Sequence, residues 1–102
     1  LYETGEDALS PNIVTLPAGA TVVLAMDFEK VLNPGTGITS VGSVTDLSDN
    51  ALVPTNKLPS QDRQAAHFTV SGMTSGETYD IRVTVATSDL QTLIGRGTLK
   101  AE

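Results

Sequence analysis

The sequence contains no cysteine and no tryptophan, and it has one histidine among its 102 residues. Without cysteine, neither a disulfide framework nor a thiolate metal site can form. The histidine, His67, alternates outward beside Phe68, so we interpret it as a surface residue rather than a catalytic base. Two tyrosines and two phenylalanines are the only aromatic residues, which leaves a modest core for a chain of one domain's length.

Positive charge is also scarce, since six lysines and arginines are outnumbered by twelve aspartates and glutamates, for a formal net charge of −6. Nucleic acids and anionic membrane surfaces both require a basic face on the protein. The longest apolar run, residues 21–26, is too short to cross a bilayer. The composition therefore argues against nucleic acid and membrane as partners.

The dominant pattern in the sequence is the alternation of apolar and polar side chains, which is typical of strands with one buried face. The clearest case is the segment in which Tyr79, Ile81, Val83 and Val85 alternate with polar or small residues. Seven strands are predicted, at residues 13–16, 21–28, 38–45, 51–53, 66–71, 79–87 and 93–101. No span of eleven or more residues keeps the helical period, so no helix is expected. The pattern predicts an all-β fold, a seven-stranded antiparallel immunoglobulin-like β-sandwich over residues 12–102.

The third predicted strand alternates imperfectly. Ile38 and Val44 share one face, whereas Val41 falls on the other, and a β-bulge near Gly42 would reconcile them. The polar residues 55–64, which come after the fourth strand, are predicted to form a loop.

The last two strands are predicted to form a hairpin. Their apolar residues share a face only if the connecting loop has an odd length, either three residues at 88–90 or five at 88–92. The shorter loop has the drawback that Leu90 is a poor residue for positive φ. In either register, inward-facing glycines such as Gly95 leave room for a bulky neighbour or for a partner's side chain.

Gly76 and Tyr79 stand where the tyrosine corner of immunoglobulin-like sandwiches lies, with the glycine in the turn and the tyrosine at the start of the strand. We therefore predict that Tyr79 is buried. Its hydroxyl is expected to bond to backbone between Val70 and Gly76.

Residues 1–11 precede the first strand and show no alternation, which predicts an extended N-terminal arm outside the sandwich. Leu1, Tyr2 and Leu9 are the apolar residues of this arm, and they are the candidate partner-binding anchors. The acidic residues between them would set orientation more than affinity.

No catalytic, cofactor-binding or metal-binding residue is predicted, and the protein is expected not to be an enzyme. Asp46, Asp49 and Asn50 could offer oxygen ligands to calcium, but six or more oxygens are needed, and a solvated turn is the favoured interpretation. Asp27 and Glu29 share a strand face, but nothing in the sequence signals the desolvation that would separate their pKa values for acid–base work.

Residues 73–83 resemble the corner between the fifth and sixth strands of fibronectin type III and bacterial immunoglobulin-like modules, with Met73 and Ser75 in place of the usual leucine and proline. Further motifs are Met26-Asp27-Phe28, Gly37-Ile38-Thr39-Ser40, Gly76 to Tyr79, Thr87-Ser88-Asp89 and Arg96-Gly97-Thr98-Leu99. With these motifs the chain from Val23 onward resembles the small immunoglobulin-like accessory proteins of tailed bacteriophage virions, although Leu90 stands where glycine is common.

This resemblance implies a non-enzymatic structural protein of the virion, assembled in the host bacterial cytoplasm. A capsid decoration (cement) protein on the head shell is the main expectation, because a self-contained domain with an anchor-bearing arm suits clamping onto a lattice. The alternatives are a tail or fibre-tail adaptor, and an immunoglobulin-like spacer or adhesin module of a bacterial surface protein. A carbohydrate-binding sandwich is least favoured, because Tyr2 alone is an evident exposed aromatic.

The implied partners are the major capsid protein or tail proteins, in a homo-oligomer or symmetric array on the particle. If the arm is not the attachment surface, the mixed-charge outer face that carries Arg82 and Arg96 is the next candidate.

Overall fold

The computed structural model describes residues 2–3, 13–48 and 52–102. Within these ranges the chain forms eight strands and no helix, which confirms the all-β prediction. The strands are β1 (Tyr2–Glu3), β2 (Ile13–Leu16), β3 (Val22–Asp27), β4 (Ile38–Asp46), β5 (Thr55–Pro59), β6 (Ala65–Val70), β7 (Thr78–Thr87) and β8 (Thr92–Ala101). No described residue belongs to a helix that could span a membrane.

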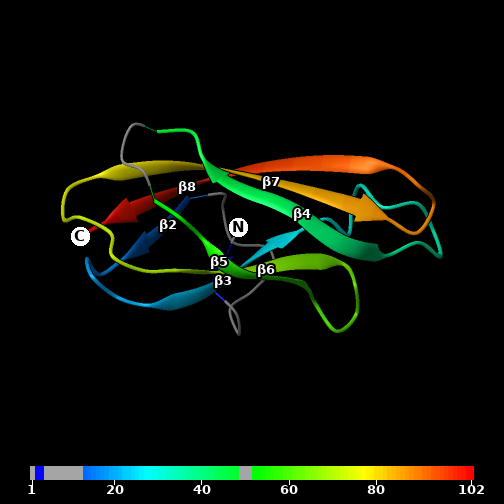
Figure 1. Cartoon of the computed structure of the whole chain (residues 1–102), viewed down its shortest axis with the longest axis horizontal. Coiled ribbons are helices and arrows are strands. Elements are labelled where there is room, and N and C mark those ends of the chain that lie inside the picture. Colours follow the sequence, from blue (N-terminus) through cyan, green and yellow to red (C-terminus); the bar gives the residue numbers. More distant parts are fainter. Residues whose placement is uncertain (1, 4–12, 49–51) are drawn as a thin grey trace.

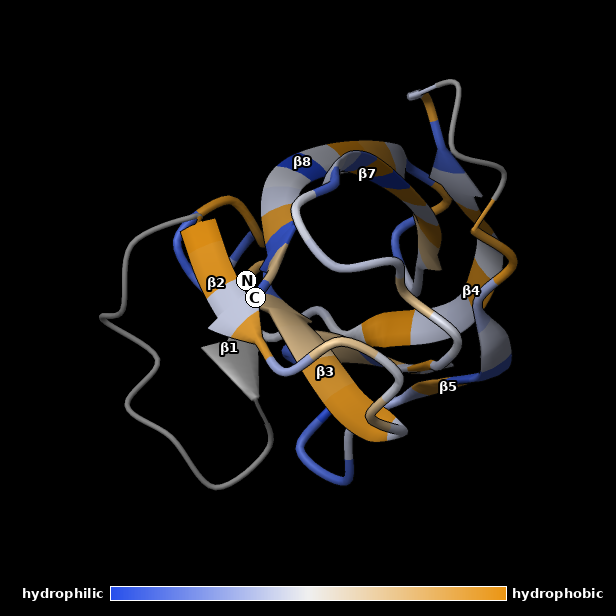
Figure 2. Ribbon diagram, turned by 90° about the vertical axis from the view of Figure 1, so that its left-hand side faces the viewer, coloured by the Kyte–Doolittle hydropathy of each residue, from blue (hydrophilic) through white to orange (hydrophobic). Residues whose placement is uncertain are grey.

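The strands form two four-stranded sheets that face each other (Figure 1). One sheet has the strand order β1-β3-β6-β5 and the other has the order β2-β8-β7-β4. Hydrophobic side chains of both sheets fill the space between the layers, including Leu24 and Phe68 from one sheet and Ile81 and Leu99 from the other, all fully buried. The end-on view in Figure 2 shows hydrophobic and polar residues alternating along β7 and β8, as expected for a sheet with one buried face.

The pairing of β7 with β8 confirms that the hairpin loop has an odd number of residues. The ladder runs from Thr78 opposite Lys100 to Ala86 opposite Thr92. The backbone amide of Thr87 then donates to the carbonyl of Gln91 at 2.9 Å, which leaves a loop of three residues at 88–90. The shorter of the two predicted loops is therefore the one that forms.

Gly95 allows the two layers to approach closely at the middle of β8. A Cβ atom at this position would collide with the sulfur of Met26 and would lie 3.1 Å from the ring of Phe28. The room that Gly95 leaves is thus filled by side chains from the opposite sheet.

The β-bulge predicted near Gly42 is confirmed. The register of β4 against β7 shifts between Val41 and Ser43, so that Gly42 is the extra residue. A second shift lies between Ile38 and Ser40. Together these irregularities keep Ile38 and Val44 on the buried side of the sheet.

The prediction of a strand at residues 51–53 is wrong, because the strand in this part of the chain is β5, within the segment expected to be a loop. β5 pairs only with β6, at the edge of its sheet, and residues 55–58 are exposed. An edge strand with so little burial needs no apolar alternation, so its polar sequence resembles a loop. Leu52 is buried in the core although it is not part of a strand.

The expectation that all strands are antiparallel is also wrong. β2 lies parallel to β8, with Ile13 opposite Thr98 and Leu16 opposite Ala101. The turn after Leu16 takes the chain from this sheet into β3 of the other sheet, so β2 joins the edge of the β8 sheet without a hairpin. An edge strand can form backbone hydrogen bonds with its neighbour in either the parallel or the antiparallel direction. The alternation of apolar residues is the same in both cases, so it does not reveal the direction of β2.

The predicted N-terminal arm contains a short strand. Residues 2–3 form β1, in which Tyr2 lies opposite Ala25 and Glu3 lies opposite Leu24 of the same chain. This part of the segment is therefore a strand of the sandwich rather than a free extension. The remainder of residues 1–11 lies outside the described residues.

Candidate functional site

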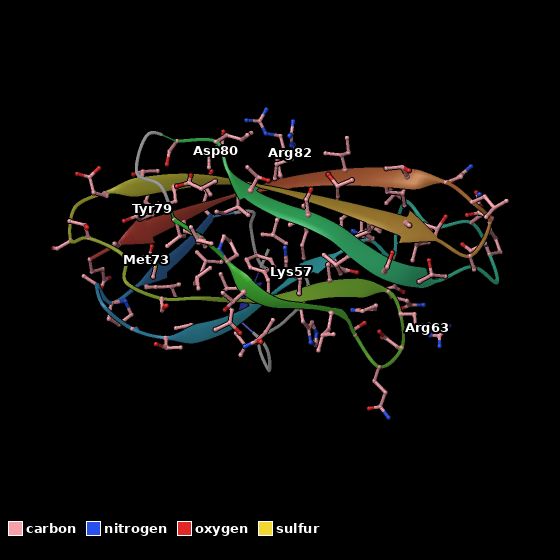
Figure 3. The ribbon with its side chains drawn as sticks, in the orientation of Figure 1. Lys57, Arg63, Met73, Tyr79, Asp80 and Arg82 are labelled. Carbon is pink, nitrogen blue, oxygen red and sulfur yellow. The ribbon has the colours of Figure 1, made fainter. Side chains whose placement is uncertain are left out.

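The start of β7 lies at the end of the sandwich near the C-terminus (Figure 1), and there the Gly76 amide donates to the carbonyl of Ala101 at 2.9 Å. Tyr79 is buried, and its hydroxyl accepts a hydrogen bond of 2.8 Å from the backbone amide of Thr74, inside the range expected from the sequence. Gly76 has a φ of 84°, a conformation that glycine adopts without steric cost. Met73 and Tyr79, labelled in Figure 3, both belong to the hydrophobic core. This arrangement anchors the turn before β7 and is structural.

The opposite end of the sandwich carries the β7–β8 loop together with the loop after β3 (Figure 1). Asn33 donates to the carboxylate of Asp89 at 2.7 Å, and the Ser88 amide donates to the carbonyl of Gly37 at 2.8 Å. The hydroxyl of Thr87 also donates to Asp89. These bonds hold the loop so that Leu90, at a φ of 65°, projects into solvent with 95% of its surface exposed.

The hydrogen bonds to Asp89 also affect its ionisation. The Thr87 hydroxyl first, and then the Asn33 amide, lower the pKa of Asp89 below its usual value. The carboxylate is thus ionised at neutral pH and acts as a fixed acceptor that joins the two loops.

An open hollow of about 470 Å³ lies between the end of β3 and the turn that joins β5 to β6. Asp27, Glu29, Asp62 and His67 line it, together with small polar residues. The Ser60 hydroxyl and the Gln64 amide lower the pKa of Asp62. Among the described residues no group of three or more acidic, histidine or cysteine side chains is arranged to hold a metal ion.

Sequence reasoning missed this grouping of Asp27 and Glu29 with Asp62 and His67. The four residues come together because β3 pairs with β6 in the register that places Ala25 opposite His67. No local sequence signal carries that register. Three carboxylates and one imidazole therefore line this open hollow.

Of the three residues considered as calcium ligands, the structure describes Asp46, at the end of β4. Asp46 accepts hydrogen bonds from the backbone amides of Ser48 and Leu52 at 2.9 and 3.0 Å, and from the Ser48 hydroxyl. Burial raises its pKa, but these hydrogen bonds outweigh burial and leave the pKa lowered. Asp46 thus closes a turn with both carboxylate oxygens engaged. Asp49 and Asn50 lie outside the described residues.

The outer surface of the β2-β8-β7-β4 sheet carries all three basic residues of its strands. We call it the basic face and define it by the outward residues Asp80, Arg82, Thr84, Ile94, Arg96 and Lys100. In Figure 3 Asp80 and Arg82 lie on the side of this sheet that points away from the other sheet. Arg96 forms an ion pair with Asp80, in which both side chains are well exposed.

The three predicted partner-binding anchors are not brought together by described contacts. Tyr2 lies in β1, paired with β3. Leu1 and Leu9 lie outside the described residues. Their role in binding a partner remains a prediction.

These features define a class of protein: a small all-β domain with loops at both ends of a two-layered sandwich and a basic face on one sheet. Comparison with known proteins identifies the family. Residues 17–100 match the model of the family described as podophage GP4 fiber-tail adaptor protein gp77. No curated protein matches the chain.

Because the match spans well over half of the sequence, the chain belongs to the podophage GP4 fiber-tail adaptor (gp77) family. It is a phage structural protein and a component of the virion. The family favours the tail or fibre adaptor, given above as the alternative, over capsid decoration.

Proposed function

We propose that this protein is a non-enzymatic adaptor that joins the fibres of a podophage to its tail. The observation that carries the proposal is the family match over residues 17–100, which covers six of the eight described strands, β3 to β8, apart from the last residue of β8. An adaptor must hold two partners at a fixed separation, and a two-layered sandwich with a packed core is rigid enough to do so.

We further propose that the sandwich is immunoglobulin-like. The bond between Tyr79 and Thr74, the turn at Gly76 and the two facing sheets support this assignment. The parallel β2–β8 pair is compatible with it, because β2 lies at a sheet edge, where a strand can join either layer.

The test is to block expression of the gene during infection and to image the particles by electron microscopy. Particles without the protein are expected to have filled heads and assembled tails but no attached fibres. Addition of the purified protein and purified fibres should restore fibre attachment, whereas addition of fibres alone should not.

Two results would contradict the adaptor proposal. Normal fibre attachment in the absence of the protein would remove its basis. Intact fibres together with heads that lose their DNA on heating would instead indicate capsid decoration, the function expected first from the sequence.

A further inference from the structure

Positive charge is concentrated on the two central strands of one sheet. β7 and β8 contain Arg82, Arg96 and Lys100, which are half of the lysines and arginines in the chain, and Asp80 is their single acidic residue. The other three basic residues share the rest of the chain with eleven acidic ones. The basic face is thus a positive area on a strongly acidic protein.

Within this area, two arginines lie directly opposite each other. Arg82 on β7 pairs with Arg96 on β8 in the antiparallel register, and both side chains point outward. Like charges at directly opposite positions destabilise a sheet. Asp80 neutralises Arg96, whereas no side-chain hydrogen bond or ion pair joins Arg82 to another described residue.

The fold gives no reason for this arrangement. The ion pair between Arg96 and Asp80 is exposed, and exposed pairs contribute little to stability. Around the arginines lie short hydroxyl side chains such as Thr45 and Thr84, and the exposed Ile94. Arginine with a nearby apolar side chain is the composition favoured at the centre of protein interfaces.

We infer that the basic face, centred on Arg82 and Arg96, is the docking surface for an acidic patch on the podophage tail. A partner carboxylate placed between the two guanidinium groups would relieve their repulsion and could bond to Arg82 in the two-pronged geometry that arginine favours. The identity of the particle in this inference rests on the adaptor proposal, whereas the chemistry of the surface does not depend on that proposal.

The charge distribution favours a protein over a nucleic acid as the occupant. Binding to a phosphate backbone draws on many positive contacts, whereas the basic face has three cations and one anion. The acidic remainder of the chain would repel the neighbouring phosphates. A folded partner can present a few carboxylates on a surface of matching size without this penalty.

The first experiment measures binding of the purified full chain to tailed particles produced without it. The variant Arg82→Gln/Arg96→Gln is compared with Lys30→Gln/Lys57→Gln, which removes the same charge from exposed sites outside the basic face. We expect the arginine variant to bind about tenfold more weakly or worse at 0.15 M salt, and the lysine variant to bind like wild type. Equal losses in the two variants, or full binding by the arginine variant, would overturn the inference.

A thermal unfolding measurement on the same variants separates binding from folding. The arginine variant loses both the repulsion between the arginines and the exposed ion pair of Arg96 with Asp80, and each contributes little to stability, so the variant is expected to melt close to the wild-type temperature. A loss of binding with an unchanged melting temperature supports a docking role. A loss that follows a lowered melting temperature would mean that the arginines act on the fold.

The second experiment keeps the inference testable if the wild-type chain fails to bind tails, a result that would refute the adaptor proposal itself. The isotopically labelled chain is titrated with hexaglutamate and, separately, with a ten-residue oligothymidylate, and amide shifts are recorded by NMR. Shifts by hexaglutamate centred on Arg82 and Arg96 support the inference. Shifts centred elsewhere, or tighter binding of the oligonucleotide at this face, contradict it. Self-association of the chain that disappears in Arg82→Gln would also contradict the inference, because the occupant of the basic face would then be a second copy of the chain.

Discussion

Replacing Tyr79 by phenylalanine removes one hydroxyl from the core and leaves the ring in place. In the structure that hydroxyl accepts one hydrogen bond, from the Thr74 amide at 2.8 Å, while Tyr79 as a whole is 2% exposed. Thr74 itself is an exposed residue, so water can reach its amide in the variant. The cost should therefore be that of one ordinary hydrogen bond, about 1 kcal/mol, rather than the larger penalty of a buried donor without a partner.

The effect can be measured by urea unfolding of the purified chain, together with hydrogen exchange at the Thr74 amide. For a domain of this size, a loss of 1 kcal/mol corresponds to a decrease of roughly 4–8 °C in the melting temperature. Exchange at Thr74 should become faster than in wild type, relative to amides of β7. A Tyr79→Leu control, which also removes the ring, should cost several times more, on the order of 3 kcal/mol. An unchanged urea midpoint in Tyr79→Phe would refute the argument that this bond anchors the turn.

Further predictions concern the hairpin, the core glycine and the acid side of the stability curve. Leu90→Gly should raise the free energy of unfolding by about 0.5 kcal/mol, because leucine is strained at positive φ, although the greater freedom of glycine in the unfolded chain offsets part of the gain. Leu90→Ala should bring no gain. Equal urea midpoints for the two variants would contradict the strain. Gly95→Ala should lower the free energy of unfolding by about 1–3 kcal/mol, because the new methyl group would collide with Met26. Gly42→Ala should be tolerated, because its Cβ would lie 3.5 Å from the nearest atom. Similar urea midpoints for the two variants would show that the core rearranges to accept the methyl group. The lowered pKa of Asp46 means that the unfolded chain binds a proton more readily than the folded one, so this stabilisation is present at neutral pH and is lost as pH falls below about 4. In urea titrations at successive pH values, Asp46→Asn should reduce the loss of stability at acid pH. An unchanged loss in the variant would mean that other carboxylates cause it.

The sequence by itself determined the features that depend on which side chains must be buried. Alternation of apolar residues located β7 and β8, and the requirement that their apolar residues share a face made the hairpin loop odd in length. The same reasoning placed a bulge near Gly42, because without a change of register Val41 falls on the face opposite to Ile38 and Val44. Burial is a property of individual side chains, so a linear pattern records it.

The tertiary structure decided the features that depend on backbone pairing between distant segments. β5 is polar because it lies exposed at an edge, and β2 joins β8 in parallel through backbone groups that all residues share. Both were therefore invisible in the pattern of side chains.

The candidate docking surface depends on one such choice. With the three-residue loop that forms, Arg82 lies opposite Arg96. A five-residue loop, which the sequence allowed equally, would have placed Thr98 opposite Arg82 and separated the two charges. Hydrogen bonds with Asn33 and Gly37 hold the residues beside Leu90 in the three-residue loop, in spite of the strained backbone of Leu90. Those bonds come from a loop more than fifty residues away in the sequence, and only the folded chain brings them to the hairpin.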